Sequence, residues 1–176
     1  PDKMLTSEEP EQQPISTAKH EIKKRDPWLI THSAEQEMGK AKKLYDEAKN
    51  LQTKAFGDIE SGRTVDVAPF KELASGFIDS VFRNQDALAC ITQMRQKDAY
   101  LLEHSINVSI LMSIFAKHLD IEKPIIEELA TGALLHDMGK IKIPDAILNK
   151  PGRYSDEEFK VMQNHARFSK EILEDA

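Results

Sequence analysis

Apolar residues recur at steps of three and four positions along most of this chain, with charged residues between them. This is the spacing of amphipathic helices, each of which turns one apolar stripe toward a core. No stretch shows the alternation of apolar and polar residues that is typical of a half-buried strand. The pattern therefore predicts an all-α fold. The predicted helices cover residues 34–56, 67–94 and 98–119, a fourth segment that ends near 137, and a fifth that begins at Ser155.

The first two predicted helices are long and are separated by a short loop. Gly57 is expected to end the first helix, and Asp66 is expected to cap the second, whose first turn accommodates Pro69. Two helices joined in this way form an antiparallel hairpin that buries a shared face. No cluster of metal-ligating residues falls on this pair, so we interpret it as a scaffold, a dimerisation element or a signal relay.

Two of the later helices each place a histidine on an apolar stripe. His104 lies on the stripe of the third helix, and His165 lies on that of the fifth. The fifth helix opens with Ser155 and Glu158, which have the spacing of a capping box. A lone histidine on such a face is usually a core residue with a hydrogen-bond partner, so neither is informative alone. The apolar residues expected to be buried on these two stripes include Leu111, Phe115, Phe159 and Ala166.

A third histidine ends the strongly apolar fourth segment, within the stretch LLHDMGK at 134–140. Burying His136 and Asp137 is costly unless these groups are paired or bind a metal. Imidazole and carboxylate ligate divalent transition metals, and Lys140 could meet a phosphate. The alternative is an ordinary helix end, where Gly139 stops the helix and Lys140 complements its dipole. Three inward histidines on three helices beside a carboxylate favour a metal site inside a bundle.

The charge, the cysteine content and the apolar runs of the chain exclude several kinds of partner and site. The net charge of −6 provides no basic field for DNA or for an anionic membrane surface. The single Cys90 excludes an intrachain disulfide and a zinc site built from cysteines. No apolar run approaches the roughly 20 residues that a membrane-spanning helix needs, and no signal peptide is recognisable. We therefore expect a cytoplasmic protein with no membrane span and no DNA partner.

Over about residues 95–176 the chain resembles the HD-GYP proteins, a branch of the HD superfamily of metal-dependent phosphohydrolases. The resemblance rests on the order and content of several short stretches, which together are far more specific than the His-Asp pair. These are KDAY at 97–100, HSINV at 104–108, GALLHDMGK at 132–140, IP at 143–144, ILNKPG at 147–152, and then Glu158, His165 and Ile172-Leu173.

The resemblance implies an HD-domain-like helical bundle that hydrolyses cyclic di-GMP, a bacterial second messenger, with iron or manganese ions. It implies that Asp137 bridges the metal ions and that Lys140 contacts the substrate phosphate. Tyr100 stands where some members have a glutamate that holds a third ion, so two divalent ions are expected. The implied metal ligands are His104, His136, Asp137 and His165.

The family's His-His-Glu stretch, its Gly-Tyr-Pro motif and a further Asp ligand are not present before Ala176. We therefore expect residues 97–176 to be the N-terminal half of an HD-GYP domain that is weakly metallated and inactive alone. Residues 34–96 are expected to be a helical lead-in that supports a homodimer. Residues 1–33 are expected to be a linker or disordered tail, the remnant of an upstream domain. The alternatives are a non-catalytic signalling or interaction module and an HD hydrolase of another cyclic dinucleotide.

Overall fold

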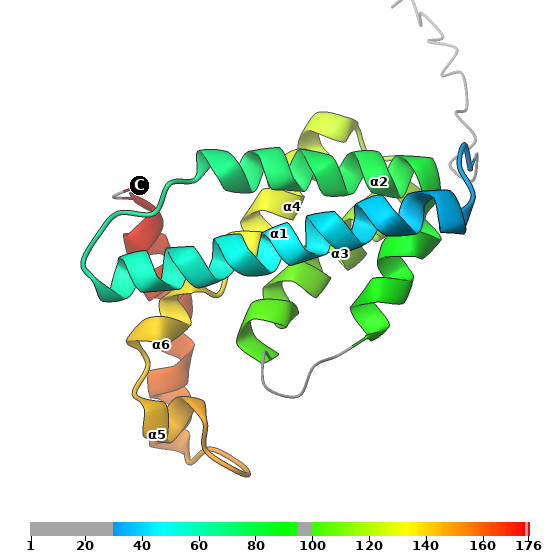
Figure 1. Ribbon diagram of the computed structural model, residues 1–176. Coiled ribbons are helices and arrows are strands. Elements are labelled where there is room, and N and C mark those ends of the chain that lie inside the picture. Colours follow the sequence, from blue (N-terminus) through cyan, green and yellow to red (C-terminus); the bar gives the residue numbers. More distant parts are fainter. Residues whose placement is uncertain (1–29, 95–99, 175) are drawn as a thin grey trace, which may run out of the picture.

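The computed structural model describes residues 30–94, 100–174 and 176, and most of these residues are helical (Figure 1). The expected linker or tail at 1–33 therefore lies almost wholly outside the described residues. No strand occurs within the described ranges, so the predicted all-α fold is confirmed. The helices are α1 (Ala34–Glu60), α2 (Ala68–Gln93), α3 (Tyr100–His118), α4 (Lys123–Leu135), the 3₁₀ helix η1 (Met138–Lys142), α5 (Asp145–Leu148) and α6 (Asp156–Glu174).

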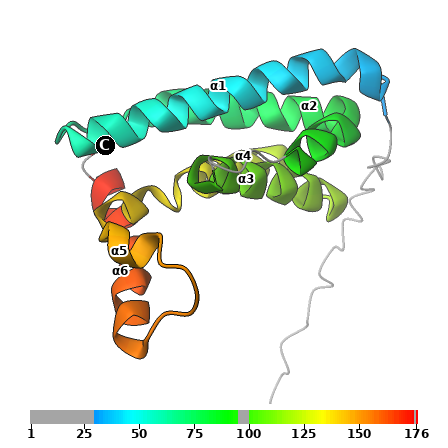
Figure 2. The ribbon, with the colours of Figure 1, turned by 60° about the horizontal axis from the view of Figure 1, so that its bottom comes forward.

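The first two helices form the predicted antiparallel hairpin, and the hairpin covers α3 and α4 as a second layer (Figure 2). Short α5 and the longer α6 extend from one end of these layers, and α6 packs mainly on η1. One continuous core lies between the layers, because the helices face each other with large apolar side chains. Its fully buried members include Phe70, Phe77, Leu88, Ile106, Ile110, Ile126 and Leu134.

The ends of α1 are set by local hydrogen bonds. Ser33 and Gln36 form a reciprocal capping box at its start. The expectation that Gly57 ends this helix is wrong, because the helix continues to Glu60. The Ser61 side chain closes it by donating a hydrogen bond to the Gly57 carbonyl at 2.7 Å. The turn that needs a glycine comes at Gly62, whose φ is +71°.

Helix α2 is interrupted at Asn84, whose backbone is extended at φ −162° and ψ 107°. The Asn84 side chain supports the break by accepting from the Asp86 N–H and donating to the His32 carbonyl, both at 2.9 Å. The buried Lys117 ammonium donates to the Val81 carbonyl at 3.0 Å. The His32 carbonyl, the Asp86 N–H and the Val81 carbonyl therefore all have hydrogen-bond partners near the break. Buried backbone groups at an interrupted helix require such partners.

A buried ion pair joins α1 to α2 beside this break. Glu37 is fully buried, and the Arg83 Nε and Nη2 atoms donate to its two carboxylate oxygens at 2.8 and 2.7 Å. The hydrogen bonds from Arg83 outweigh the opposing effect of burial and lower the pKa of Glu37 below its ordinary 4.5. The paired geometry is the bidentate fork that arginine forms with carboxylates.

This lowered pKa predicts a pH dependence of stability. Because the folded pKa of Glu37 is below 4.5, its ionised form stabilises the fold above pH 4.5, and this contribution is lost as the pH falls through the folded pKa. Urea unfolding of the wild type and of Glu37→Gln should therefore give a difference in unfolding free energy that is large at pH 7 and shrinks below 4.5. A difference that stays constant down to pH 3 would contradict the proposed linkage.

Two predicted apolar stripes are corrected by the structure. Leu111 and Phe115 on α3 are 52 % and 62 % exposed, because α3 is apolar around much of its circumference and buries the face that contains Ile106 and Ile110. Phe159 is 52 % exposed and Ala166 is also exposed, since the buried residues of α6 lie only near its C-terminal end. None of the helices in the described ranges combines the length with the apolar character that a membrane crossing requires.

Candidate metal centre

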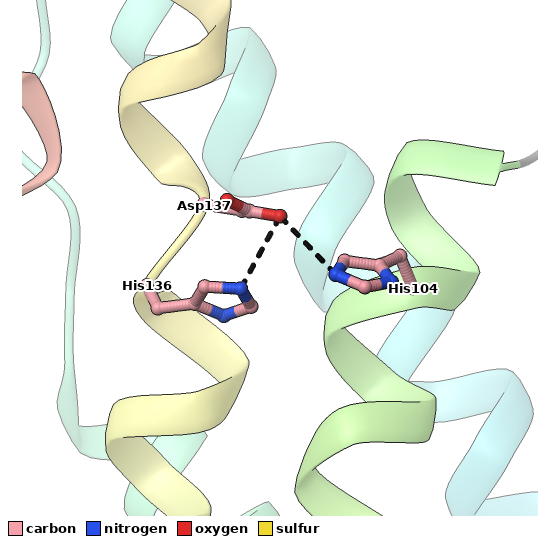
Figure 3. A group of neighbouring side chains, drawn as sticks. All are labelled: His104, His136 and Asp137. Carbon is pink, nitrogen blue, oxygen red and sulfur yellow. Dashed lines mark ion pairs between the residues drawn. The ribbon is translucent and has the colours of Figure 1, made fainter. Parts of the chain in front are cut away.

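Five candidate side chains from separate parts of the sequence meet where α3, α4, η1 and α6 converge. His104 comes from the first turns of α3, and His136 directly follows the last residue of α4. Asp137 follows in the turn before η1, whereas Lys140 lies in η1 and His165 lies in the middle of α6. Figure 3 shows His104 and His136 pointing from neighbouring helices toward Asp137. The structure therefore brings together every site residue that the sequence analysis singled out.

The Asp137 carboxylate is the centre of this cluster and is only 2 % exposed. Its Oδ2 atom lies 3.3 Å from His136 Nε2 and 3.6 Å from His104 Nε2. Its Oδ1 atom lies 3.5 Å from His165 Nε2. The ligand atoms of His104, His136 and Asp137 all fall within 4.8 Å of one another. Two imidazoles thus face one carboxylate oxygen, and a third imidazole faces the other.

The hydrogen bonds of the imidazoles fix which nitrogen is available. His136 Nδ1 lies 2.7 Å from the Ala133 carbonyl, and His165 Nδ1 lies 2.6 Å from the Met162 carbonyl. A carbonyl oxygen only accepts, so each Nδ1 carries a proton and donates it to the carbonyl, and Nε2 of each ring is the nitrogen that faces Asp137. Metal-binding histidines commonly donate one ring N–H to a carbonyl in this way and bind the metal through the other nitrogen.

Lys140 supplies the positive charge in the protein as it stands. Its Nζ donates to Asp137 Oδ2 at 2.6 Å, and its side chain is 18 % exposed. The reading of this stretch as an ordinary helix end does not hold. Helix α4 already ends at Leu135, and Gly139 lies inside η1 rather than at a helix terminus. Lys140 therefore pairs with the carboxylate at the centre of the cluster instead of complementing the dipole of α4.

Two further residues, Gly139 and Ser169, hold the cluster together, and the sequence assigned neither of them to the site. Gly139 lies so close to α6 that a Cβ atom built there would be 2.1 Å from the His165 carbonyl oxygen. The Ser169 side chain, 4 % exposed, bonds to the backbone of the turn that carries His136 and Asp137. A polar residue one helical turn after His165, on the same face of α6, is the signal that could have identified Ser169. The side chain of Tyr100 lies outside the described part of the chain.

Comparison with known proteins divides the chain into two matched regions. Residues 101–176 match the family described as HD domain. Residues 1–70 match a family described as a domain of unknown function, DUF3391. The HD match contains all five residues of the cluster, and the other match overlaps α1 and the start of α2.

Several curated relatives match part of the chain. The chain is 34 % identical over 141 residues to a cyclic di-GMP phosphodiesterase of Pseudomonas aeruginosa, which covers 80 % of the chain and 34 % of that relative. It is 31 % identical over 103 residues to a cyclic di-GMP phosphodiesterase of Thermotoga maritima, which covers 58 % of the chain and 27 % of the relative. A 3'3'-cGAMP-specific phosphodiesterase of Vibrio cholerae is 36 % identical over 77 residues, or 44 % of the chain and 17 % of the relative. The chain thus spans about a third or less of these relatives. No solved structure matches the chain significantly.

Proposed function

We propose that this chain, an HD-domain protein through its residues 101–176, is part of a metal-dependent phosphodiesterase that hydrolyses cyclic di-GMP. The observation that carries the proposal is the buried Asp137 carboxylate, which three imidazole Nε2 atoms approach within 3.6 Å. The substrate is inferred from two relatives that match the chain over more than 100 residues and that are named cyclic di-GMP phosphodiesterases. The alternative of a non-catalytic signalling or interaction module does not account for three imidazoles from separate elements that face one buried carboxylate.

The residues of the cluster fit two divalent ions. His104, His136, His165 and Asp137 would hold the ions, and Asp137 would be shared between them because imidazoles face both of its carboxylate oxygens. Imidazole and carboxylate ligands suit iron and manganese, the ions that we propose here. When bound, such ions activate water and offset the negative charge that develops on a phosphodiester.

Lys140 is proposed to bind the phosphate of the substrate. Its ammonium now lies on Asp137 Oδ2, from which it would turn to the scissile phosphate when cations take over the carboxylate. A positive charge placed there stabilises the increase in negative charge as the phosphodiester is cleaved.

The variant Lys140→Met should show whether Lys140 contributes to turnover, to metal binding, or to both. We expect turnover to fall by about 100-fold, the typical loss when one charge-stabilising group is removed. We expect the dissociation constant for Mn²⁺ not to rise, because the ammonium competes with metal for Asp137 Oδ2. Calorimetric titration with Mn²⁺ and a product assay measure the two quantities. Loss of Mn²⁺ binding in this variant would show that Lys140 supports the metal site rather than the substrate.

The domain layout also belongs to this proposal. Residues 97–176 would form the first half of the catalytic domain and residues 34–96 a helical lead-in, with residues 1–33 as a linker. A homodimer through residues 34–94 stays a prediction. Within that range only Met94 is a large exposed apolar residue, so such a dimer would join mainly polar surfaces. Light scattering of the purified protein would test it.

The proposed function is tested with the complete gene product that contains these residues. The protein is loaded with Mn²⁺, or anaerobically with Fe²⁺, and incubated separately with cyclic di-GMP and with 3'3'-cGAMP. Chromatography should show linear dinucleotide or GMP from cyclic di-GMP at the higher rate. A clear preference for 3'3'-cGAMP would favour the alternative hydrolase. No product from either substrate would overturn the proposal and favour a non-catalytic module.

A further inference from the structure

The proposed metal site depends on the distance between two elements that are far apart in the sequence. His136 and Asp137 lie in the turn that follows α4, whereas His165 lies on α6, which packs mainly on η1. His165 faces Asp137 Oδ1 across 3.5 Å. A small shift or rotation of α6 would separate these side chains. The contacts between α6 and the turn therefore decide whether the ligands lie together.

Ser169 makes two hydrogen bonds across this contact. Its Oγ accepts from the Gly139 N–H at 2.8 Å and donates to the His136 carbonyl at 2.6 Å. One hydroxyl thus pairs with the backbone on both sides of Asp137. Ser169 is 4 % exposed, so water cannot readily replace either bond.

The position of Ser169 on α6 links these bonds to His165. Residues four apart on a helix lie on the same face, one above the other, so Ser169 and His165 both face the turn. The Gly139 backbone also lies against α6, where an added Cβ would be 2.4 Å from the Ser169 nitrogen. The two elements are therefore in direct backbone contact, and the hydroxyl sets both their separation and their relative rotation.

We propose that Ser169 is a positioning residue for the metal site, because its hydroxyl fixes the turn carrying His136 and Asp137 against the helix carrying His165. This inference rests on the proposed function for its consequence, which is metal affinity. The contact itself is independent of metal. Both hydrogen bonds of the Ser169 hydroxyl go to the backbone of the turn, so its effect on the ligands is transmitted through that backbone.

The test compares Ser169→Ala with Ser113→Ala. Ser113 is fully buried and donates within α3 to the Ser109 carbonyl at 2.8 Å, so its variant also removes one buried hydroxyl. For Ser169→Ala we expect a rise of about 10- to 100-fold in the dissociation constant for Mn²⁺, the usual effect of losing a second-shell partner. We also expect faster hydrogen exchange of the Gly139 amide in the metal-free protein. Ser113→Ala should match the wild type in both measurements, and circular dichroism confirms that each variant is folded.

The outcomes separate this inference from the proposed function. An unchanged Mn²⁺ affinity in Ser169→Ala, even with lower thermal stability, would overturn the positioning role and leave the metal site intact. If the complete gene product that contains these residues binds no divalent ion, the proposed function fails, and amide exchange alone decides the inference. Faster Gly139 exchange in Ser169→Ala would then support the fixed turn, and unchanged exchange would overturn it.

Discussion

Replacement of Asp137 by alanine is expected to abolish turnover and metal binding together. Asp137 faces His104, His136 and His165 at once, so its loss removes a shared partner of all three imidazoles. We expect Mn²⁺ affinity to fall by more than about 100-fold, the upper value for losing a residue that merely supports a ligand. Calorimetric titration with Mn²⁺ and a phosphodiesterase assay measure the two effects.

Asp145→Ala provides the matched control for this substitution. Asp145 is an exposed carboxylate in α5 that accepts a hydrogen bond from Asn149 at 2.8 Å, so its loss leaves the cluster untouched. It should bind Mn²⁺ as the wild type does. If Asp137→Ala retained turnover, the bridging role of this carboxylate would be wrong.

Gly139→Ala is expected to have the second-largest effect, although the change adds one methyl group. The new Cβ would lie 2.1 Å from the His165 carbonyl and 2.4 Å from the Ser169 nitrogen, both of which are backbone atoms that cannot rotate away. Helix α6 must therefore move, and it carries His165 with it. A displacement of about 1 Å at a catalytic group costs about 100-fold in rate. Overpacking should also lower the unfolding free energy by about 1–3 kcal/mol.

Gly132→Ala is the control that tests whether the clash with α6 causes the effect of Gly139→Ala. Gly132 lies in α4, one turn before His136, and a Cβ there meets nothing within 4 Å. Because alanine favours helix over glycine, this variant should be as stable as the wild type or more stable by up to about 1 kcal/mol. Urea unfolding and the rate of cyclic di-GMP hydrolysis compare the two variants. Equal behaviour of Gly132→Ala and Gly139→Ala would rule out the steric explanation.

The helical periodicity was enough to predict the all-α fold. His104 and His165 do face the same carboxylate, although several residues of the stripes to which they were assigned are exposed. Periodicity along one helix contains no information about which helices meet. The three histidines were grouped because each was expected to face inward, and the resemblance to a known family implied their roles as ligands. The ligand roles themselves stay a prediction until a metal is bound and measured.

The features that the sequence did not reveal depend on contacts between elements. Gly139 has the same local signal as a helix-ending glycine, yet its role is the close approach of η1 to α6. Asn84 breaks α2 because its side chain finds partners at His32 and Asp86, one of them more than fifty residues away. The stripe of α3 was assigned to the wrong face because apolar residues surround much of that helix, so that tertiary packing selects the buried side.

The contact between Lys140 and Asp137 gives the candidate centre an internal counter-ion. An ammonium 2.6 Å from the buried carboxylate neutralises it before any metal arrives. Folding of the polypeptide and acquisition of its ions are therefore separable events, unlike in small zinc domains that stay unfolded until the metal binds. If divalent ions occupy the proposed site, the protein can fold first and receive the ions afterwards.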